Sequence, residues 1–518
     1  MKYKFIINII LLVMSITLII GCTERKNKIA NKESDTNLLL TKIDEYTPEE
    51  ILTCNVDSYE MDLKLDTDKK VLSGNIIMNL TNETEDTLDK ICIRNYAASA
   101  LKKDKKGSSI IKSAVLADTN DVLTIDVKKD PSVVYLDFSK HQIKPGESVS
   151  VKLNFITDIP NYKYRFGYHS DGNNQIFQLS FCFPTISMYE NGEWNESPFI
   201  FSGAESNFNK VTDYNVKLEV PEGYMVVASG DENTDGLITT ISGSNMRELA
   251  IIVSNYMNVE TETTKNGIII NNYTLDYDIE EYNNFSMDSA KDSIELYSAL
   301  FGDYPYKELD IVQTFQNFAM EYPGLLMIGF PDFKEIEDIP QQASYLELCT
   351  KVSHEIAHQW FYAAVGSDPY KEPWLDEGFA EYCEDVLYRL SGAKSYVEAI
   401  KSDHRRLNET NIFESQSEEE FNTYMDDYVN QITGEKFIIN KDYDEYHSDD
   451  YSKYIYEGGK MFLYELRKSM GDSAFFNTLR EYYNSYCFKE AKGIDFIKLV
   501  ITFDDSEETK KVICKYIE

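Results

Sequence analysis

We expect an α+β multidomain protein, with an N-terminal β-sandwich or saddle domain over residues 43–262 and an α/β, then helical, domain over residues 263–518. Three observations predict this fold class. The chain of 518 residues is longer than one hydrophobic core ordinarily supports. Apolar residues alternate at period two in the first half and follow the helical period in the second. Hydrophobic residues make up 42% and charged residues 27%, which is typical of a globular chain.

The first 22 residues indicate export. Lys2 and Lys4 precede an uncharged, mostly apolar run, and this pattern predicts a lipoprotein signal peptide over residues 1–21. The run ends in Leu-Ile-Ile-Gly before Cys22, which resembles the bacterial lipobox, whose cysteine is lipidated. We therefore expect a lipid-anchored bacterial lipoprotein outside the cytoplasm, held at the cell membrane, with residues 22–42 as a polar tether. The alternative is an uncleaved anchor helix with an incidental cysteine.

The β-rich half is predicted from successive alternating segments. Residues 59–65, 74–80 and 149–155 each place apolar side chains at every second position. Residues 214–220 do the same and run into Pro221-Glu-Gly, a turn sequence. We therefore expect strand after strand from about Ile43 to Asn258.

The second half predicts helices with recognisable ends. Pro373 precedes one helix and Gly392 follows it, the usual arrangement of Pro at the start and Gly at the end. The acid- and Tyr-rich segment 414–450 has weak periodicity, and we expect a partly irregular insertion. The other expected elements are helices over 287–301, 344–365 and 456–470, the last closed by Gly471, and a strand over 309–315.

Charge and cysteine usage exclude some classes of function. The chain carries 51 Lys+Arg and 88 Asp+Glu, a net charge of −37. Such a field repels phosphate backbones, so we expect no nucleic-acid partner. The seven cysteines after Cys22 are scattered without a CxxC pair, and we interpret them as small buried hydrophobic residues rather than a disulfide framework.

The motif His354-Glu355-Ile-Ala-His358 lies inside the expected helix over 344–365. Histidines at i and i+4 share one helix face, so both imidazoles can reach one metal ion. Glu355 is rotated about 100° from His354, which suits a general base beside the metal rather than a ligand. A pair of structural histidines on a helix face is the alternative for this motif taken alone.

Glu377 supplies the third expected ligand. It stands nineteen positions after His358, at the start of the next helix, in the run Trp-Leu-Asp-Glu-Gly-Phe-Ala-Glu-Tyr. Two antiparallel helices joined by a short loop bring this carboxylate opposite the histidine pair. A His₂Glu set leaves a fourth position for water, as catalytic zinc sites do, so we expect one Zn²⁺ per chain.

Four sequence blocks resemble the aminopeptidase N and leukotriene hydrolase family of zinc peptidases, the gluzincins with an HExxH-x18-E motif. They are His-Glu-Ile-Ala-His-Gln-Trp-Phe, Trp-Leu-Asp-Glu-Gly-Phe-Ala-Glu-Tyr, Phe318-Ala-Met-Glu-Tyr-Pro-Gly and Tyr454-Ile-Tyr-Glu-Gly-Gly. The resemblance extends from about residue 50 onward. It implies a thermolysin-like catalytic domain behind the β-rich domain, and it implies the same zinc ligands, His354, His358 and Glu377, with Glu355 as base.

The resemblance also implies two substrate-contacting residues. Glu321 would bind the free α-amine of a peptide, and Tyr456 would donate a hydrogen bond to the tetrahedral oxyanion. Tyr451 and Tyr454 are rivals for the second role. The family's Gly and Asn on either side of Ala-Met-Glu are Phe318 and Tyr322 here, which puts the first subsite in doubt. A second amine-binding residue could be either Gln175 or Gln178.

We therefore expect a zinc aminopeptidase that removes N-terminal residues from extracellular peptides. The alternatives are a zinc endopeptidase with the same site and a non-catalytic surface lipoprotein that keeps zinc for structure and peptide binding. An epoxide-hydrolase side activity is a weaker possibility. The expected partners are peptides with a free N-terminus and, through the lipid anchor, the membrane; the oligomeric state stays open.

Overall fold

The computed structural model describes residues 38–99, 108–200, 205–275, 280–316, 318–329, 345–389, 391, 418–434, 436–447 and 450–518. The expected signal peptide over 1–21, Cys22 and most of the expected tether lie outside these residues. Within them, no helix combines the length and the apolar character needed to cross a membrane.

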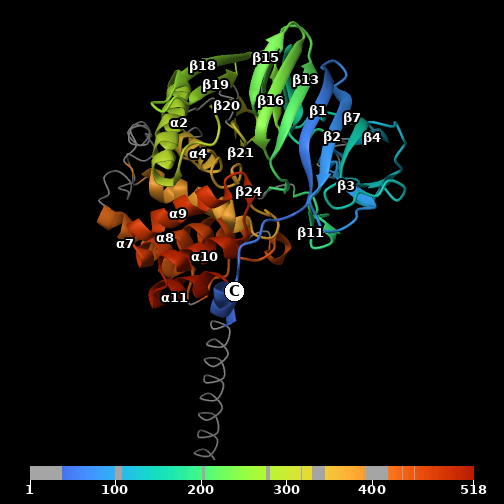
Figure 1. Ribbon diagram of the computed structural model, residues 1–518. Coiled ribbons are helices and arrows are strands. Elements are labelled where there is room, and N and C mark those ends of the chain that lie inside the picture. Colours follow the sequence, from blue (N-terminus) through green and yellow to red (C-terminus); the bar gives the residue numbers. More distant parts are fainter. Residues whose placement is uncertain are drawn as a thin grey trace, which may run out of the picture.

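A seven-stranded sheet forms one side of the β-rich domain (Figure 1). Its strands are antiparallel except for one central parallel pair, β1 with β13. In spatial order they are β15 (Asp231–Asp235), β16 (Ile238–Met246), β13 (Thr212–Glu219), β1 (Cys54–Asp66), β2 (Val71–Asn82), β7 (Ser148–Asp158) and β4 (Ser108–Leu116).

Smaller sheets complete this domain. Two have four strands each, and a two-stranded ribbon and the short helix η1 (Tyr96–Ala98) accompany them. In spatial order the strands are β10 (Thr185–Ile186), β3 (Lys90–Arg94), β6 (Val133–Asp137) and β5 (Ile125–Val127); β14 (Met225–Ala228), β17 (Ile251–Ser254), β9 (Asn174–Leu179) and β8 (Phe166–Asp171); and β11 (Tyr189–Glu190) with β12 (Glu193–Trp194).

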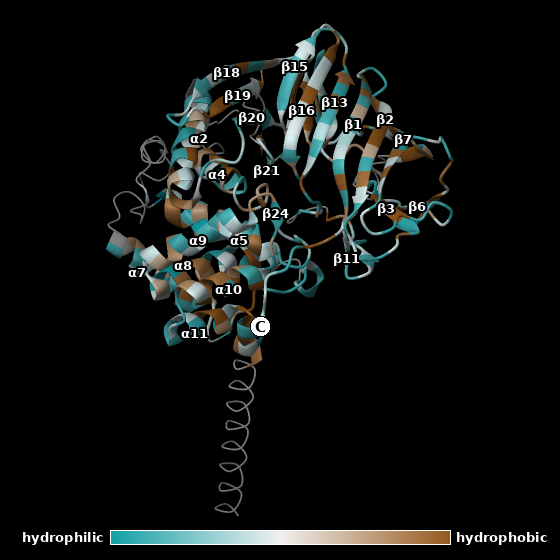
Figure 2. Cartoon of the chain, in the orientation of Figure 1, coloured by the Kyte–Doolittle hydropathy of each residue, from teal (hydrophilic) through white to brown (hydrophobic). Residues whose placement is uncertain are grey.

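The period-two pattern produces these sheets because it gives each strand one apolar face. Along β1 the side chains of Tyr59, Met61 and Leu63 are buried and alternate with exposed polar ones. Figure 2 shows this alternation as stripes across β1, β13 and β16. The buried faces of the sheets form one continuous hydrophobic core.

A five-stranded sheet begins the second half of the fold, and β21 is one of its edge strands. In spatial order the strands are β18 (Met257–Thr263), β19 (Ile269–Leu275), β20 (Glu308–Thr314), β22 (Leu325–Gly329) and β21 (Ala319–Tyr322). The helices that follow are α2 (Glu280–Phe301), α4 (Tyr345–Ala357), η3 (Pro373–Leu375), α5 (Glu377–Tyr382), the π-helix η4 (Cys383–Tyr388), α7 (Glu418–Ile432), η5 (Tyr443–Glu445), the π-helix η6 (Lys453–Glu457), α8 (Gly458–Met470), α9 (Asp472–Tyr486), α10 (Gly493–Phe503) and α11 (Glu507–Tyr516). A short parallel pair joins β23 (Val365–Gly366) to β24 (Lys489–Glu490).

The helix expected over 344–365 is shorter than predicted. It ends at Ala357, and the chain then turns, with the Ala363 amide donating to the His358 carbonyl at 2.9 Å. Tyr362 adopts a positive φ of 149° in this turn. Every side chain from Ile356 to Val365 is buried, so apolar periodicity could not distinguish the turn from a further helical segment.

Most other helical predictions are confirmed. The helix after Pro373 continues through a 3₁₀, an α and a π segment to Tyr388, and the last predicted helix ends at Met470, with Gly471 at φ 77°. Within its described residues, the segment expected to be a partly irregular insertion contains the regular helix α7.

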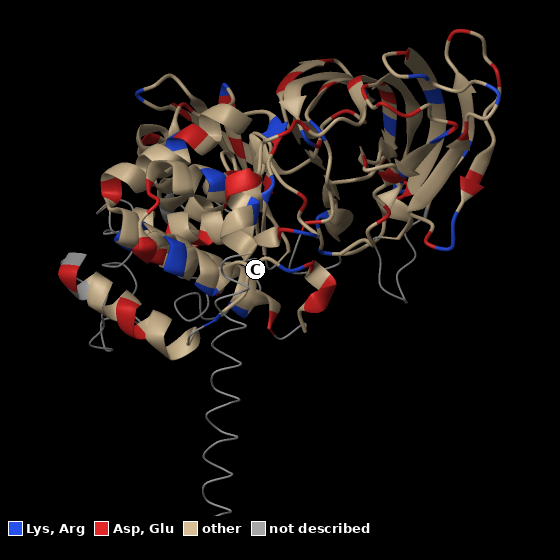
Figure 3. Ribbon diagram, turned by 60° about the horizontal axis from the view of Figure 1, so that its bottom comes forward, with Lys and Arg blue, Asp and Glu red and all other residues tan. Residues whose placement is uncertain are grey.

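Residues 38–45, at the end of the expected tether, form a short helix that packs on the catalytic half (Figure 1). Ile43 is buried in the core of that half, and Lys498 in α10 donates to its carbonyl at 2.8 Å. Most of the described cysteines are buried, as predicted. Figure 3 shows Asp and Glu on both the β-rich and the helical parts, so the acidic charge is not confined to one of them.

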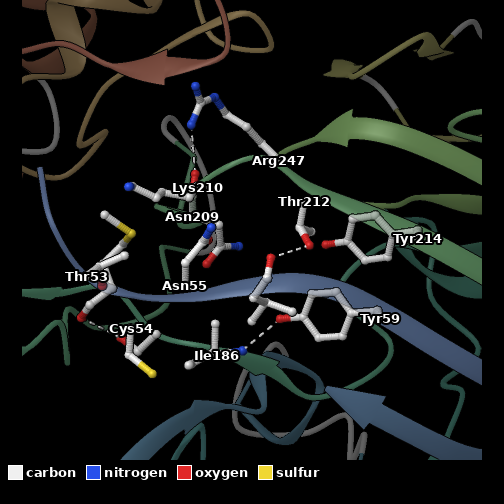
Figure 4. A pocket seen from close by; sticks show the side chains of 13 residues that line it. Thr53, Cys54, Asn55, Tyr59, Ile186, Asn209, Lys210, Thr212, Tyr214 and Arg247 are labelled. Atoms are coloured by element: carbon white, nitrogen blue, oxygen red, sulfur yellow. Dashed lines mark hydrogen bonds between the residues drawn. The ribbon is translucent and has the colours of Figure 1, made fainter. Parts of the chain in front are cut away.

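Arg247 links the two halves of the chain. Its buried guanidinium donates to the carbonyl oxygens of Tyr362 and Asn209, each at 2.8 Å, and pairs with Glu490 at 2.7 Å. Figure 4 shows Arg247 reaching from the end of the green strands toward the Asn209 loop, beside a pocket lined by Tyr59 and Tyr214. Arg247 also donates to the carbonyl oxygens of Ala364 and Lys489, so a buried guanidinium with acceptors from both halves fixes the β-rich domain against the turn that follows α4.

Candidate active site

The two histidines of the motif lie at the C-terminal end of α4. His354 is in its last turn and His358 follows in the turn just beyond it, and their ring centroids are 5.0 Å apart. Both side chains are buried. The predicted i, i+4 arrangement therefore holds, although the second histidine has already left the regular helix.

Glu377 lies opposite the histidine pair at the first residue of α5. Its Oε2 is 3.3 Å from Nε2 of His354 and 3.6 Å from Nε2 of His358. One donor atom from each of the three residues lies within 4.8 Å of the other two. The structure therefore brings together the three residues that the spacing predicted as zinc ligands.

Two glycines allow the helix carrying Glu377 to approach α8. A Cβ added to Gly459 would lie 2.5 Å from Cα of Gly378, and one added to Gly378 would lie 2.8 Å from Cα of Gly459. Only hydrogen fits at both positions, so the backbones of α5 and α8 touch there. This close contact places η6, which precedes α8, beside Glu377.

Tyr456 is the tyrosine of its group that reaches the site. Its hydroxyl donates to Oε1 of Glu377 at 2.6 Å, and its ring lies parallel to that of His354 at 6.3 Å. Tyr454 instead stacks on Phe437 at 4.4 Å, and Tyr451 packs edge-on against Tyr456. The structure therefore favours Tyr456 over both rivals.

Carboxylates surround the outer nitrogens of both histidines, and the sequence reasoning missed them. Nδ1 of His358 is 2.5 Å from Oδ1 of Asp376, and both side chains are almost fully buried, at 1% and 3% exposed. Nδ1 of His354 faces two carboxylates, Glu384 at 3.2 Å and Glu381 at 3.6 Å. Such partners fix the tautomer of a metal-binding imidazole. The position of Asp376 directly before Glu377 is the sequence feature that could have identified it as a partner of the histidines.

Glu321 and Glu355 form the other wall of the site. Glu321 is on the edge strand β21 and is 6% exposed, and Glu355 on α4 is 7% exposed. The two carboxyl groups share a side-chain hydrogen bond. Burial is the main cause that raises the pKa of both groups, and for Glu321 the neighbouring carboxylates of Glu355 and Asp376 add to it.

The two residues that depart from the family pattern pack around β21. Tyr322 is 1% exposed, and the ring of Phe318 packs on Tyr164 of the β-rich domain at 5.6 Å. Gln359, just after the second histidine, clamps the turn after β21: its amide donates to the Tyr322 carbonyl at 3.2 Å and accepts from the Gly324 amide at 2.9 Å. The sequence analysis did not single out Gln359.

The two glutamines considered as amine-binding residues have different surroundings. Gln175 accepts hydrogen bonds from Lys70 at 3.0 Å and Tyr224 at 2.8 Å, both within the β-rich domain. Gln178 is buried and donates to Gln316 of the catalytic half, beside Met327. Only Gln178 therefore faces the catalytic half, and neither glutamine is hydrogen-bonded to Glu321.

The donor set and its charge fit zinc. Burial opposes a charged imidazole, but hydrogen bonds with Glu377 and Glu384 raise the pKa of His354, and Asp376 and Glu321 raise that of His358. Burial also opposes the charged form of Glu377, but hydrogen bonds and charge interactions with the two imidazoles hold its pKa well below its usual range. The pocket thus concentrates negative charge around two imidazoles, and a divalent cation bound by N, N and O donors would balance that charge.

Comparisons with known proteins agree with this geometry. Residues 285–515 match the family described as the peptidase family M1 domain. Endoplasmic reticulum aminopeptidase 1 of Mus musculus is 30% identical over 153 residues, which is 29% of this chain and 16% of that protein. Aminopeptidase N of Lactobacillus delbrueckii subsp. lactis is 27% identical over 256 residues, which is 47% of this chain and 28% of that protein. The matches therefore span less than a third of either relative.

A solved structure shares the fold over most of the chain. The M1 zinc metallopeptidase of Deinococcus radiodurans superposes with a TM-score of 0.60 at 16% identity, covering 91% of this chain and 95% of that one. A mutant of that enzyme bound to a Tyr-Ser-Ala substrate superposes with a TM-score of 0.57 at 16% identity, covering 91% and 96%.

Proposed function

We propose, from the match of residues 285–515 to the peptidase family M1 domain, that the protein is a zinc-dependent aminopeptidase. His354, His358 and Glu377 would hold the zinc ion. Bound there, zinc would act as a Lewis acid on the carbonyl oxygen of the first peptide bond and on the attacking water. The curated relatives are named as aminopeptidases, which supports this choice over other hydrolases.

Residues of this chain then carry out the proton transfers, stabilise the oxyanion and position the peptide. Glu355 takes the proton of the attacking water and returns it to the leaving amine. Tyr456 releases Glu377 and donates its hydroxyl hydrogen bond to the developing oxyanion. β21 is an edge strand of its sheet, so its outer backbone groups would pair with an extended peptide and place the first peptide bond beside Glu355.

The position of Glu321 is the observation that carries the exopeptidase proposal. Its carboxyl is buried beside Glu355, at the edge of the sheet next to the two histidines. A peptide ammonium that pairs with Glu321 would supply the positive charge this buried acidic group lacks. Pairing with the first residue's amine also limits cleavage to the first peptide bond. The tripeptide substrate of the Deinococcus enzyme is consistent with this use of the site.

A pair of matched peptides tests the proposal. We expect the wild type to cleave the free-amine peptide at least 100-fold faster than its N-acetylated form, because a lost charge-assisted contact in a buried site costs about 3 kcal/mol. Glu321→Gln should lower cleavage of the free-amine peptide and narrow that ratio, while Glu355→Gln should abolish cleavage of both with zinc content unchanged. Equal cleavage of both peptides by the wild type would instead indicate an endopeptidase.

We also propose that the enzyme acts outside the cytoplasm, anchored by a lipid on Cys22. The support is the sequence around Cys22 alone. Metabolic labelling with a radioactive fatty acid should mark the full chain but not Cys22→Ala. Labelling that persists in this variant would contradict the anchor.

A further inference from the structure

A second group of carboxylates lies where the β-rich domain meets the catalytic sheet, remote in sequence from the zinc ligands. Glu232 comes from β15, an edge strand of the seven-stranded sheet, and Glu308 and Asp310 come from β20. One carboxylate oxygen from each residue lies within 4.8 Å of the other two. Figure 1 shows β15 close to β19 and β20 at the top of the molecule.

The strand geometry directs these side chains toward one another. Glu308 and Asp310 are two residues apart on β20, so they share one face of the strand. Glu232 is the single residue of β15 that is not exposed, which turns its carboxylate inward. Its Oε1 accepts a hydrogen bond from the Ala228 amide, which holds the side chain in place.

Asp310 provides a second, independent sign of a ligand. The residue is 1% exposed, and while its Oδ1 accepts from Asn271 at 2.9 Å, its buried Oδ2 has no hydrogen-bond partner. Among the described residues, no lysine or arginine forms an ion pair with any of the three carboxylates. A buried carboxylate oxygen without a partner is costly, since neither water nor a donor compensates its charge.

Burial and repulsion between carboxylates raise the pKa values of all three acids. Burial and the Asp310 carboxylate raise the pKa of Glu232 to about 9. Burial also raises the pKa of Asp310, and burial together with Asp231 raises that of Glu308. The three acids therefore need either protons or a cation to coexist.

We propose that Glu232, Glu308 and Asp310 form a calcium site that ties the β-rich domain to the catalytic sheet. The donors are all oxygens, which suits a hard cation rather than zinc. Calcium binds oxygen at about 2.3–2.6 Å, so donors within 4.8 Å of one another can share one ion. Water and backbone carbonyl groups would complete its shell of six to eight oxygens.

Calcium titration of the zinc-loaded full-length protein tests this site. By calorimetry at physiological salt, the wild type should bind one Ca²⁺, and its melting temperature should rise by a few degrees when calcium is in excess. Asp310→Asn should weaken calcium binding at least tenfold and remove that rise. Without calcium, this variant should melt no lower than the wild type, because it has lost a mutually repelling charge. Asp235→Asn, at an exposed position of β15, the strand that carries Glu232, is the matched control and should behave as the wild type.

Two further measurements keep the test decisive. If Asp310→Asn does not fold, Glu232→Gln takes its place, since a glutamine oxygen can still accept from the Ala228 amide. Tyr273 is near enough to interact electrostatically with all three carboxylates, so it should sensitise Tb³⁺ emission, and Tyr273→Phe should reduce that emission. Weak uptake of several Ca²⁺ ions that Asp310→Asn leaves unchanged would overturn the proposal. Zinc content and peptidase activity are measured separately, so failure of this site and failure of the proposed activity are distinguishable.

Discussion

Replacing Asp376 should weaken zinc binding even though Asp376 is not expected to touch the metal. Its Oδ1 lies 2.5 Å from Nδ1 of His358; the Asp376 side chain is 3% exposed and the His358 side chain 1% exposed. Partners of this kind typically contribute 10- to 100-fold to metal affinity, or about 1.4–2.7 kcal/mol. We expect Asp376→Asn near the lower value, because the amide oxygen can still accept the His358 hydrogen bond.

Asp376→Ala should reach the upper value. Without the carboxylate, Nδ1 of His358 keeps only the Phe361 carbonyl, at 3.4 Å. The matched control is Glu384→Gln. His354 has a second carboxylate, Glu381, at 3.6 Å from the same nitrogen, so this variant should lose less than tenfold.

Competition with a zinc chelator of known affinity measures these differences, and activity at saturating zinc shows whether the rest of the site is intact. We expect the order wild type, Glu384→Gln, Asp376→Asn, Asp376→Ala from strongest to weakest binding. Zinc affinity of Asp376→Ala within threefold of the wild type would refute the reasoning, as would an equal loss in Glu384→Gln.

Three further predictions concern the site and its support. Tyr456→Phe should lower kcat about 10- to 100-fold with little change in KM, measured with an aminoacyl amide, because its hydroxyl acts on the oxyanion; an unchanged kcat would contradict that role. Gly459→Ala should destabilise the fold by about 1–3 kcal/mol in denaturant unfolding, because a Cβ would lie 2.5 Å from Cα of Gly378; wild-type stability would show that the helices can separate at no cost. Burial and the nearby Glu205 carboxylate raise the pKa of Glu248 to about 8, so the folded state keeps a proton that the unfolded chain releases near 4.5, and this contribution to stability is lost as the pH rises through that range. The melting temperature of Glu248→Gln relative to the wild type should therefore rise between pH 5 and pH 8, and a constant difference would contradict the shift.

Sequence patterns predicted the parts of the fold that depend on short segments. Alternation at period two identified β1, β2, β7 and β13, because a strand with one buried face must place apolar residues at every second position. The same patterns failed after Ala357. A fully buried turn and a buried helix have the same apolar composition. What distinguishes the turn here is a tertiary contact, the hydrogen bond that the Tyr362 hydroxyl donates to Glu248 of the β-rich domain.

The sequence by itself predicted His354, His358 and Glu377 as metal ligands and Glu355 as the base, because the i, i+4 spacing places both histidines on one side of a helix and Glu377 begins the next helix. Only the tertiary structure decided which tyrosine reaches Glu377, which carboxylates hold the two histidines, and that Gln359 clamps the strand carrying Glu321. It also brought Glu232 to Glu308 and Asp310, residues more than seventy positions apart. Each of these pairings depends on two distant segments packing together, and no local spacing encodes the distance between them.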